Sequence, residues 1–329
     1  MPDIIQVGLG PIGQQMVEYA LQRPSLNIVG AVDVDPQKIG RDVGEFCGLA
    51  PLGILISATL DEAIRKRKPH VALVTTVSSL KAFEPQAVEI ARAGIHIVST
   101  CEELFFPWNT QPEIARRIDA VCTENNVVCL GAGVNPGYLM DFLPTVLSGL
   151  CQHVKSVNVW RVQDAAVRRI PFQRKIGAGL PLDEFEAKRK AGTLRHVGLP
   201  ESIDFIAHRL GWKLDRRIEI LEPIIAEKGI TAGYKPIAKG MVCGVRQVGC
   251  GFVGEDEVIR LTFVAAVGQP DPYEQIEIDG VPTVHCRISG GINGDAATCG
   301  IALNCIGSVL RSAPGLKTMA DIPPVAFLP

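Results

Sequence analysis

The sequence predicts an α/β protein in which a doubly wound parallel sheet is joined to a second, α+β domain with a largely antiparallel sheet. The first part rests on apolar runs that alternate with helical patterns, as at 71–77, 95–101 and 127–133, because such alternation builds parallel sheets. The second rests on strand-like runs after residue 152 that follow one another through short glycine and proline turns. A chain of 329 residues is also long enough for two domains.

The first strand and helix carry the most specific signal. Residues 5–13, IQVGLGPIG, place Gly8, Gly10 and Gly13 in G-x-G-x-x-G spacing between a strand-like run and an amphipathic helix. These glycines permit a tight turn, a close backbone approach to a pyrophosphate, and close packing of helix on strand. Asp33 ends the next apolar run, where a carboxylate accepts ribose hydroxyls. A glycine-rich turn that binds nothing is the alternative. The glycine spacing together with the flanking strand, helix and Asp33 predicts instead a dinucleotide site on a Rossmann-type sheet. Pro11 and Ile12 are expected to be part of this site.

Further coenzyme contacts are expected where the other strands end, because ligands of open parallel sheets lie outside the carboxyl ends of the strands. Hydroxyl groups after the run at 71–77 can bind ribose or phosphate, although capping the next helix is an equal use for them. Asp33 favours NAD because it repels a 2′-phosphate, whereas nearby cations can attract one. Use of both NAD and NADP is therefore expected. The candidates are Asp33, Lys38, Arg41, Thr75, Thr76, Ser78, Cys101 and Asn135.

Composition excludes several classes of function. Hydrophobic residues make up 47% and charged residues 21% of the chain, and the net charge is −2, without the basic excess of a nucleic-acid-binding protein. The N-terminus enters the first strand at once, and no apolar run reaches the length of about 18 residues that a membrane span needs. We therefore expect a cytoplasmic protein that acts on a small molecule.

Ten cysteines are scattered along the chain without a C-x-x-C pair. Most lie in apolar runs such as VVCLGAG, where a free cysteine behaves as a small hydrophobe in a reducing compartment. The neighbours His285 and Cys286 lack partners at ligand spacing. No metal site is expected.

The chain divides into three expected regions. Residues 1–145 form the dinucleotide-binding domain, and residues 146–296 form an α+β substrate and dimerisation domain. Residues 297–329 form a helix and tail that pack back on the first domain, because Ile301 and Cys305 share a helical face before an Ala-Pro-Gly stop. A cleft between the two domains is the expected site.

CEEL places Glu102 and Glu103 just beyond a predicted strand, at the edge where a nicotinamide is expected. Successive side chains of an extended backbone diverge, so one carboxylate can face the site while the other makes a structural hydrogen bond. The apolar neighbours Cys101 and LFFPW indicate a poorly hydrated setting, in which a carboxylate can serve as a general base near neutral pH. Two solvated loop residues are the alternative.

Candidate substrate residues come from several segments. Asn135 offers an amide, although a plain turn at Pro136 explains it equally well. A substrate carboxylate needs a cation, usually a bidentate arginine; for each candidate cation, a satisfied ion pair is the more ordinary role. If the candidate cations are engaged in such ion pairs, aromatic side chains, including Trp108, line an apolar pocket. The candidates are Phe106, Asn135, Pro136, Tyr138, Phe142, Arg161, Arg169, Lys175 and His196.

Taken together, these segments resemble the 2,4-diaminopentanoate dehydrogenase family and the related native amine dehydrogenases, within the dihydrodipicolinate reductase-like group. The resemblance spans nearly the whole chain and rests on VGLGPIGQ with AVDVDPQKIGRDVGE, STCEEL, GVNPGY-x-MD, R-x-PFQ-x-KIG-x-G and HVGLPESI. It implies NAD(P)-dependent oxidative deamination of an amine or diamino acid to a ketone or aldehyde with release of ammonia, and the reverse reductive amination. It also implies a homodimer joined through the sheet of the second domain.

In this reaction a glutamate takes a proton from the ammonium form, so that the nitrogen lone pair can assist hydride departure to the nicotinamide. A loose analogy with dehydrogenases whose strand ends in C-E-K-P, with the catalytic lysine second after the cysteine, favours Glu103 over Glu102. Arginine or lysine in the pocket favours a diamino acid, and an apolar pocket favours a simple amine.

Two other functions are alternatives. A dihydrodipicolinate reductase-like enzyme reduces an imine or a conjugated double bond with the same coenzyme. The paired histidines followed by a lysine and the D-A-P-S-G-T loop of those reductases have no counterpart in the corresponding region, IPFQRKIGAGLPLDEF. A redox-sensing or scaffolding protein can keep a nucleotide fold without turnover, but two carboxylates at the expected nicotinamide position argue against that function.

Overall fold

The computed structural model describes residues 1–194 and 196–329 and divides into two compact units. The first unit comprises Met1–Tyr138 and Asp295–Pro329, and the second comprises Leu139–Gly294. The division falls after Tyr138 rather than after residue 145, because helix α6 (Phe142–Ser148) packs against elements of the second unit. The predicted fold class, a parallel α/β sheet with a second, mostly antiparallel sheet, is confirmed.

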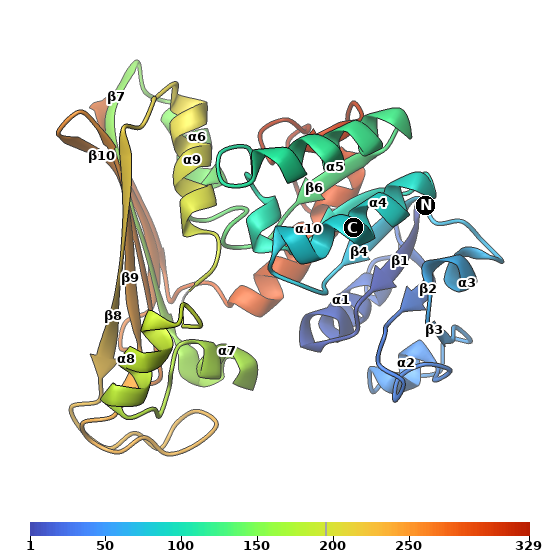
Figure 1. Cartoon of the computed structure of the whole chain (residues 1–329), viewed down its shortest axis with the longest axis horizontal. Coiled ribbons are helices and arrows are strands. Elements are labelled where there is room, and N and C mark those ends of the chain that lie inside the picture. Colours follow the sequence, from blue (N-terminus) through green and yellow to red (C-terminus); the bar gives the residue numbers. More distant parts are fainter. Residues whose placement is uncertain (195) are drawn as a thin grey trace. The chain divides into compact units, whose positions relative to one another are not determined.

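The first unit is built on a parallel sheet, in which Figure 1 labels β1, β2, β3, β4 and β6. The strand order is β13-β6-β5-β4-β1-β2-β3. Strand β1 lies inside this sheet, between β2 and β4, and all five of its residues are buried. Such strands read as continuous apolar runs because helices cover both faces of the sheet. The strands are β1 (Asp3–Val7), β2 (Asn27–Val32), β3 (Ile56–Ser57), β4 (Val71–Val74), β5 (His96–Ser99), β6 (Val128–Gly131) and β13 (Gly315–Lys317).

The C-terminal segment is part of the first unit. Helix α10 (Gly294–Val309) buries Cys305 and Val309, as the helical spacing predicts, while Ile301 is half-buried. Strand β13 then pairs with β6 in parallel and forms the edge of the sheet. The sequence pattern does not reveal β13, since three residues are too few to show a period. The other helices of this unit are α1 (Pro11–Leu21), α2 (Val43–Phe46), α3 (Leu60–Ile64), α4 (Leu80–Arg92), η1 (Glu102–Leu104) and α5 (Pro112–Glu124).

The second unit is built on a mixed sheet with the strand order β12-β11-β7-β10-β9-β8. Only β7 and β10 pair in parallel; the other neighbours are antiparallel. Strands β8 and β12 were not anticipated, because exposed charged residues interrupt their apolar patterns. The strands are β7 (His153–Asp164), β8 (Arg216–Ile225), β9 (Val242–Val253), β10 (Asp256–Ala266), β11 (Tyr273–Val281) and β12 (Val284–Ser289).

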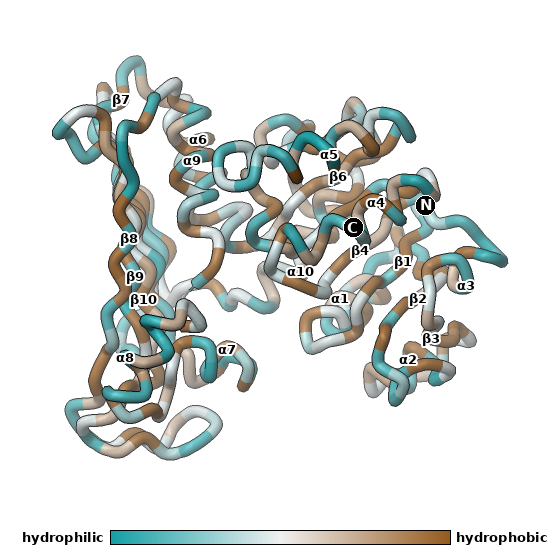
Figure 2. Tube along the Cα trace, viewed as in Figure 1, coloured by the Kyte–Doolittle hydropathy of each residue, from teal (hydrophilic) through white to brown (hydrophobic). Residues whose placement is uncertain are grey.

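Helices cover one face of this second sheet. Helix α9 (Leu199–Leu210) packs against β9 and β10, and Figure 2 shows brown, apolar stretches along the strands of this sheet. Gly249 and Gly251 lie directly under α9, where a Cβ atom would meet the side chain of Ile203 at 2.8 and 3.1 Å. The remaining helices of the unit are α6, η2 (Ala165–Val167), α7 (Ile170–Lys175) and α8 (Leu182–Lys190).

Gly131 couples the first sheet to the short helix η1. A Cβ atom at this position would lie 2.9 Å from the backbone of Leu104 and Phe105. We therefore expect Gly131→Ala to displace η1 and to destabilise the protein by about 1–3 kcal/mol, measured as a lower midpoint of thermal unfolding.

The matched control is Gly300→Ala in helix α10, where an added Cβ atom meets nothing within 4 Å. Alanine in a helix interior is favoured over glycine by about 0.5–1 kcal/mol, so this variant should unfold at the same or a higher temperature. Equal destabilisation of both variants would contradict the packing of η1 on β6.

Candidate functional site

The carboxyl ends of the parallel strands bring the predicted coenzyme residues into one row. In the order of the sheet, the row runs from Asn135 after β6 through Glu102 after β5, Thr75 after β4 and Gly8 after β1 to Asp33 after β2. Strands β2 and β5 are three strand spacings apart, or about 14 Å. The row therefore has the reach of an extended ligand rather than of a single ion.

The glycine loop between β1 and α1 is tightly packed at two positions and open at the third. Gly8 has φ +88°, which favours glycine, and a Cβ atom at Gly13 would lie 2.0 Å from the Gly8 carbonyl oxygen. A Cβ atom at Gly10 would meet nothing within 4 Å. This open side of the loop leaves room for a ligand to contact the backbone.

Helix α1 begins at this loop with Pro11 as its first residue, followed by Ile12. Its N-cap, Gly10, provides no side-chain acceptor for the N–H groups of the first turn, and that turn holds no acidic residue. Unsatisfied N–H groups and the positive end of the helix dipole form a site for a phosphate group.

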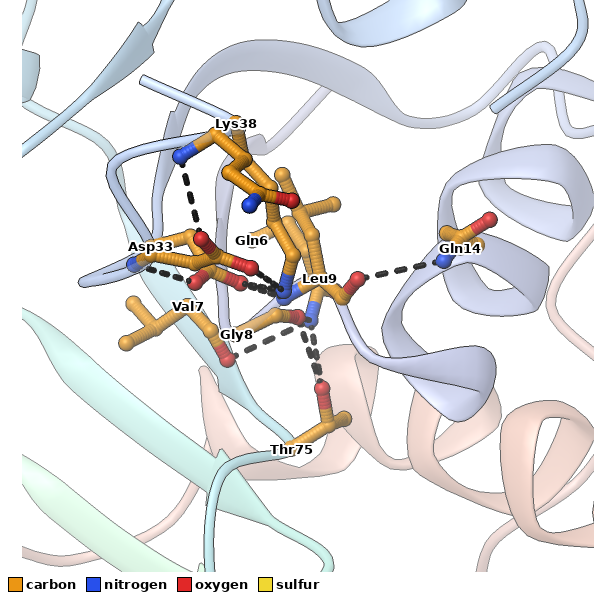
Figure 3. A network of polar contacts seen from close by, with 10 residues as sticks. Gln6, Val7, Gly8, Leu9, Gln14, Asp33, Lys38 and Thr75 are labelled. Carbon is orange, nitrogen blue, oxygen red and sulfur yellow. Dashed lines mark hydrogen bonds and ion pairs between the residues drawn. The ribbon is translucent and has the colours of Figure 1, made fainter. Parts of the chain in front are cut away.

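Asp33 links the end of β2 to the glycine loop (Figure 3). Its Oδ2 accepts hydrogen bonds from Leu9 N at 2.7 Å and from Lys38 Nζ at 2.9 Å, and its Oδ1 accepts one from Asp35 N at 3.0 Å. Burial raises the pKa of Asp33, but the bonds from Lys38 and the two backbone N–H groups outweigh it and hold the pKa below its usual value. The side chain is therefore a fixed, ionised carboxylate at neutral pH.

Of the two cations that the sequence offers after β2, Lys38 pairs with this carboxylate. Lys38 and Arg41 both approach the ring of Phe46, at 5.9 and 4.9 Å from its centroid. Lys38 is also 3.8 Å from Asp35 Oδ2, whereas Arg41 is exposed. The segment after β2 thus holds a carboxylate paired with a lysine, and an exposed arginine that follows in the sequence.

Thr75 takes part in a network that the sequence analysis missed. Gln6 Nε2 donates to the Gly8 carbonyl and to Thr75 Oγ1, each at 2.9 Å, and Thr75 Oγ1 donates to the same carbonyl at 2.9 Å (Figure 3). The single hydroxyl proton of Thr75 is therefore engaged within the protein. A glutamine inside a buried strand run was the available signal, because such strands are otherwise apolar.

Thr76 and Ser78 also make hydrogen bonds within the protein. Thr76 Oγ1 donates to Gln86 Oε1 at 2.8 Å on the exposed side of α4. The carbonyl of Ser78 accepts a hydrogen bond from Glu103 N at 3.3 Å. These contacts tie the loop after β4 to its neighbouring segments.

The carboxylate pair lies in η1, directly after β5, and both side chains are half-buried. Glu103 Oε2 accepts hydrogen bonds from Leu80 N at 2.9 Å and from Gln111 Nε2 at 2.7 Å. Leu80 is the first residue of α4, whose N-cap, Ser79, makes no side-chain cap bond. Glu103 therefore caps α4.

Cys101, which precedes the pair, is 2% exposed. Burial raises the pKa of its thiol, and the neighbouring Glu102 raises it further. The Cys101 side chain is thus a neutral, apolar neighbour of the two carboxylates, as the sequence suggested.

The turn after β6 holds the remaining candidates of the first unit. Gly137 has φ +136°, and a Cβ atom there would lie 2.3 Å from the Gly133 carbonyl oxygen. Asn135 and Phe106 are 8% and 3% exposed. The candidates in this unit are Phe106, Asn135, Pro136 and Tyr138.

Arg161 forms a buried ion pair in the second unit. It is 1% exposed, its Nη1 donates to Glu274 Oε1 at 2.6 Å, and its Nη2 donates to the Ile292 carbonyl at 3.2 Å. Burial lowers the pKa of Arg161 to about 10 and raises that of Glu274 to about 7, against the attraction between the two groups. The charge of Arg161 is therefore compensated inside the protein.

The other substrate candidates of this unit lie on or near helices. Arg169 precedes α7 and is exposed, Lys175 ends α7 and is half-buried, and Phe142 begins α6. The ring of His196 stacks on Phe263 at 4.5 Å.

Gln247 holds the His196 segment and was missed in the sequence. Its side chain accepts from His196 N at 2.7 Å and donates to the His196 carbonyl at 3.0 Å. Gln247 lies within the strand-like run at 242–253, where an inward-facing glutamine was the available signal.

Neither a metal cluster nor a membrane-spanning helix is found within residues 1–194 and 196–329. No group of three potential ligands from His, Cys, Asp and Glu is arranged to hold a metal ion there. Within the same residues, no helix has the length and apolar character to span a bilayer.

Comparison with known proteins gives two family matches. The model described as "2,4-diaminopentanoate dehydrogenase C-terminal domain" matches residues 138–328, and that described as "Dihydrodipicolinate reductase, N-terminus" matches residues 3–100. The first covers more than half of the chain, including the whole of the second sheet.

Three relatives match nearly the full length. A 2,4-diaminopentanoate dehydrogenase from Acetoanaerobium sticklandii is 30% identical over 97% of this chain and 93% of its own. An amine dehydrogenase from Streptomyces virginiae is 24% identical over 96% and 94%. The structure of an amine dehydrogenase from Mycobacterium smegmatis superposes with a TM-score of 0.88 at 21% identity, covering 99% of this chain and 97% of that one.

The match to the reductase model ends within the first unit, whereas the dehydrogenase relatives follow the chain through both units. The family resemblance noted in the sequence is thereby confirmed. The chain belongs to the 2,4-diaminopentanoate dehydrogenase family.

Proposed function

We propose that the protein is an NAD(P)-dependent amine dehydrogenase that oxidatively deaminates an amine or diamino acid to a ketone or aldehyde plus ammonia, and catalyses the reverse reductive amination. The observation that carries the proposal is the 30% identity to a 2,4-diaminopentanoate dehydrogenase along 97% of the chain. The reductase alternative is not favoured, because the reductase model matches only residues 3–100.

The first unit fits a nicotinamide coenzyme. The open face at Gly10 and the N-terminus of α1 suit the pyrophosphate, and Asp33 suits the adenosine ribose. When bound, the coenzyme accepts the hydride from the amine-bearing carbon. The chain must orient that carbon, exclude water and remove a proton from the ammonium group before hydride departs.

The base comes from the carboxylate pair after β5, and we assign it to Glu102. Glu103 already caps α4 and is held by Gln111, which orients its carboxylate toward those groups. Glu102 is the other carboxylate of the same turn, and its side chain is half-buried. This assignment reverses the order of preference drawn from the C-E-K-P analogy. Glu103 then fixes the turn in which Glu102 acts.

The substrate class depends on whether a cation of the chain pairs with a substrate carboxylate. Arg161 is compensated by Glu274, so it is a poor partner for an α-carboxylate. This favours a simple amine held by apolar side chains such as Phe106. A diamino acid instead requires Arg169 or Lys175 as its carboxylate partner.

The test is the formation of reduced coenzyme when purified protein is mixed with NAD or NADP and an amine at mildly alkaline pH. The panel contains 2,4-diaminopentanoate, cyclohexylamine and pentylamine. Turnover of any amine with stoichiometric ammonia supports the proposal. Coenzyme binding without turnover on the whole panel, together with reduction of a cyclic imine, overturns it.

We expect Glu102→Gln to reduce kcat at least 100-fold while leaving the Kd for NAD unchanged, because general-base catalysis contributes about 10²–10⁴-fold. Glu103→Gln should keep most of kcat but unfold at a lower temperature, because a neutral side chain caps α4 less well. Initial rates and thermal unfolding measure both effects. The opposite pattern would return the base to Glu103.

We expect Asp33→Ala to shift coenzyme preference toward NADP by about 10-fold or more in the ratio of kcat/KM values, because removing the carboxylate ends its repulsion of a 2′-phosphate. Lys38 then becomes available to that phosphate. Lys38→Met is the matched variant and should weaken NADP binding more than NAD binding. An unchanged ratio in both variants would mean that Asp33 and Lys38 do not contact the ribose.

The pKa of Asp33 also sets a pH dependence. Because this pKa is lower in the folded protein, the stabilisation from Asp33 is fully present above the usual pKa and is lost as the pH falls through the lowered value. The preference for NAD should therefore persist through the neutral range.

A homodimer joined through the second sheet completes the proposal. Trp160, Thr262, Val248 and Ile220 lie side by side across four strands, on the face opposite α9, and Ile220 is 46% exposed. Ion pairs from Arg246 to Glu222 and from Arg260 to Glu257 flank this row. An apolar centre with polar surroundings suits a second copy of the same face.

Sedimentation should give twice the mass of one chain, and Ile220→Asp should give a monomer. A monomeric parent protein contradicts the assignment.

The proposed compartment is the cytoplasm. All ten cysteines carry free thiols, including the buried Cys122 and Cys129 in the first unit, which suits a reducing environment. Cell fractionation with an antibody against the chain tests this assignment, and recovery outside the cytoplasm overturns it.

A further inference from the structure

Gln6 places an amide inside a fully buried strand of the first sheet. It is 2% exposed, in a strand whose residues are all buried, and it pairs with Ala31 of β2 and Leu73 of β4. A buried amide is unfavourable unless its polar atoms are hydrogen-bonded. Its position next to the glycine loop therefore calls for a physical reason.

The hydrogen bonds of Gln6 have a defined direction. Gln6 Nε2 can only donate, so Thr75 Oγ1 accepts from it and gives its own proton to the Gly8 carbonyl. Gln6 Nε2 also donates to that carbonyl directly, at 2.9 Å. Both lone pairs of the Gly8 oxygen are thus used by side chains from β1 and from the end of β4.

The same peptide unit is held at its other end. The Gly8 carbonyl and the Leu9 N–H belong to one planar amide, and Leu9 N donates to Asp33 Oδ2 at 2.7 Å. Gln6, Thr75 and Asp33 therefore fix the orientation of the Gly8–Leu9 peptide plane (Figure 3). The next residues of the chain, from Gly10, are those expected to contact the pyrophosphate.

The network is not explained by stability alone. Gln6 Oε1 is buried and has no hydrogen-bond partner among the described residues, and an unsatisfied buried acceptor is destabilising. An aliphatic side chain at position 6 avoids that penalty. The arrangement gives up stability while it holds one carbonyl of the glycine loop.

We propose that Gln6 and Thr75 are a positioning pair that fixes the Gly8–Leu9 peptide and thereby sets the affinity of the glycine loop for the coenzyme. Thr75 acts through the Gly8 carbonyl rather than by contacting the coenzyme. The proposal requires coenzyme binding but not amine turnover, so a failure of the proposed reaction leaves it testable.

The first test is Gln6→Leu, which keeps the approximate volume of the side chain and removes its amide. The Kd for NAD, measured by titration of the purified full-length protein, should rise about 5-fold, since one net hydrogen bond is worth about that factor. KM for NAD should rise equally with kcat little changed, and the thermal midpoint should stay the same or increase. An unchanged Kd with a lower midpoint would overturn the proposal.

A double-mutant cycle tests whether the two residues act through the same carbonyl. Thr75→Val should weaken NAD binding by a similar factor, and Thr75→Ser, which keeps the hydroxyl, should restore it. If both residues act through Gly8, the effects of Gln6→Leu and Thr75→Val should be non-additive. Additive effects would mean that Thr75 contacts the coenzyme independently and would overturn the pairing.

Asn27→Leu is the matched control at the opposite, amino end of the same sheet. Asn27 Nδ2 donates to Asp3 Oδ1 at 2.6 Å, so this variant also loses a side-chain amide bond. It should lower the thermal midpoint without changing the Kd for NAD. An equal loss of NAD affinity in Asn27→Leu would show a general effect of destabilisation and would count against the proposal.

Discussion

The contact between helix α1 and the Gly8 carbonyl governs the architecture of the first unit. The helix comes so close that position 13 has no room for a Cβ atom. This approach places the N-terminus of α1 at the edge of the sheet, beside Asp33 and the end of β4. The glycine loop, the carboxylate of β2 and the hydroxyl after β4 can form a single surface only because this contact is short.

Charged candidate residues in each unit are already paired with an opposite charge of the same unit. Asp33 pairs with Lys38, and Arg161 pairs with Glu274. The two pairs differ in burial: Lys38 remains partly accessible, whereas both members of the Arg161 pair are at most 5% exposed. A ligand can therefore exchange with the first pair at low cost, but opening the second leaves a buried charge. Selectivity between coenzymes is accordingly easier to alter than the interior of the second unit.

Local pattern was sufficient to predict the fold class, the glycine loop, Asp33 and the elements around the carboxylate pair. These features depend on neighbours in sequence: strand and helix periods, turn residues, and the position just after a strand. The roles of Gln6, Gln111 and Gln247 could not be predicted, because their partners lie in other segments. The proposed division of roles between Glu102 and Glu103 also depends on a contact between separate segments. Only the fold shows that Glu103 lies against the start of α4.

The pairing of β13 with β6 gives the first unit a discontinuous sequence, because its last strand is separated from the others by the whole second unit. During synthesis, residues 139–294 leave the ribosome as one continuous stretch, before the strand that completes the other sheet exists. The nascent first unit therefore has an open edge at β6 throughout translation of the second. The residues that close this edge, Gly315–Lys317, are added only after the whole second unit, so assembly of the two units is ordered by the direction of translation.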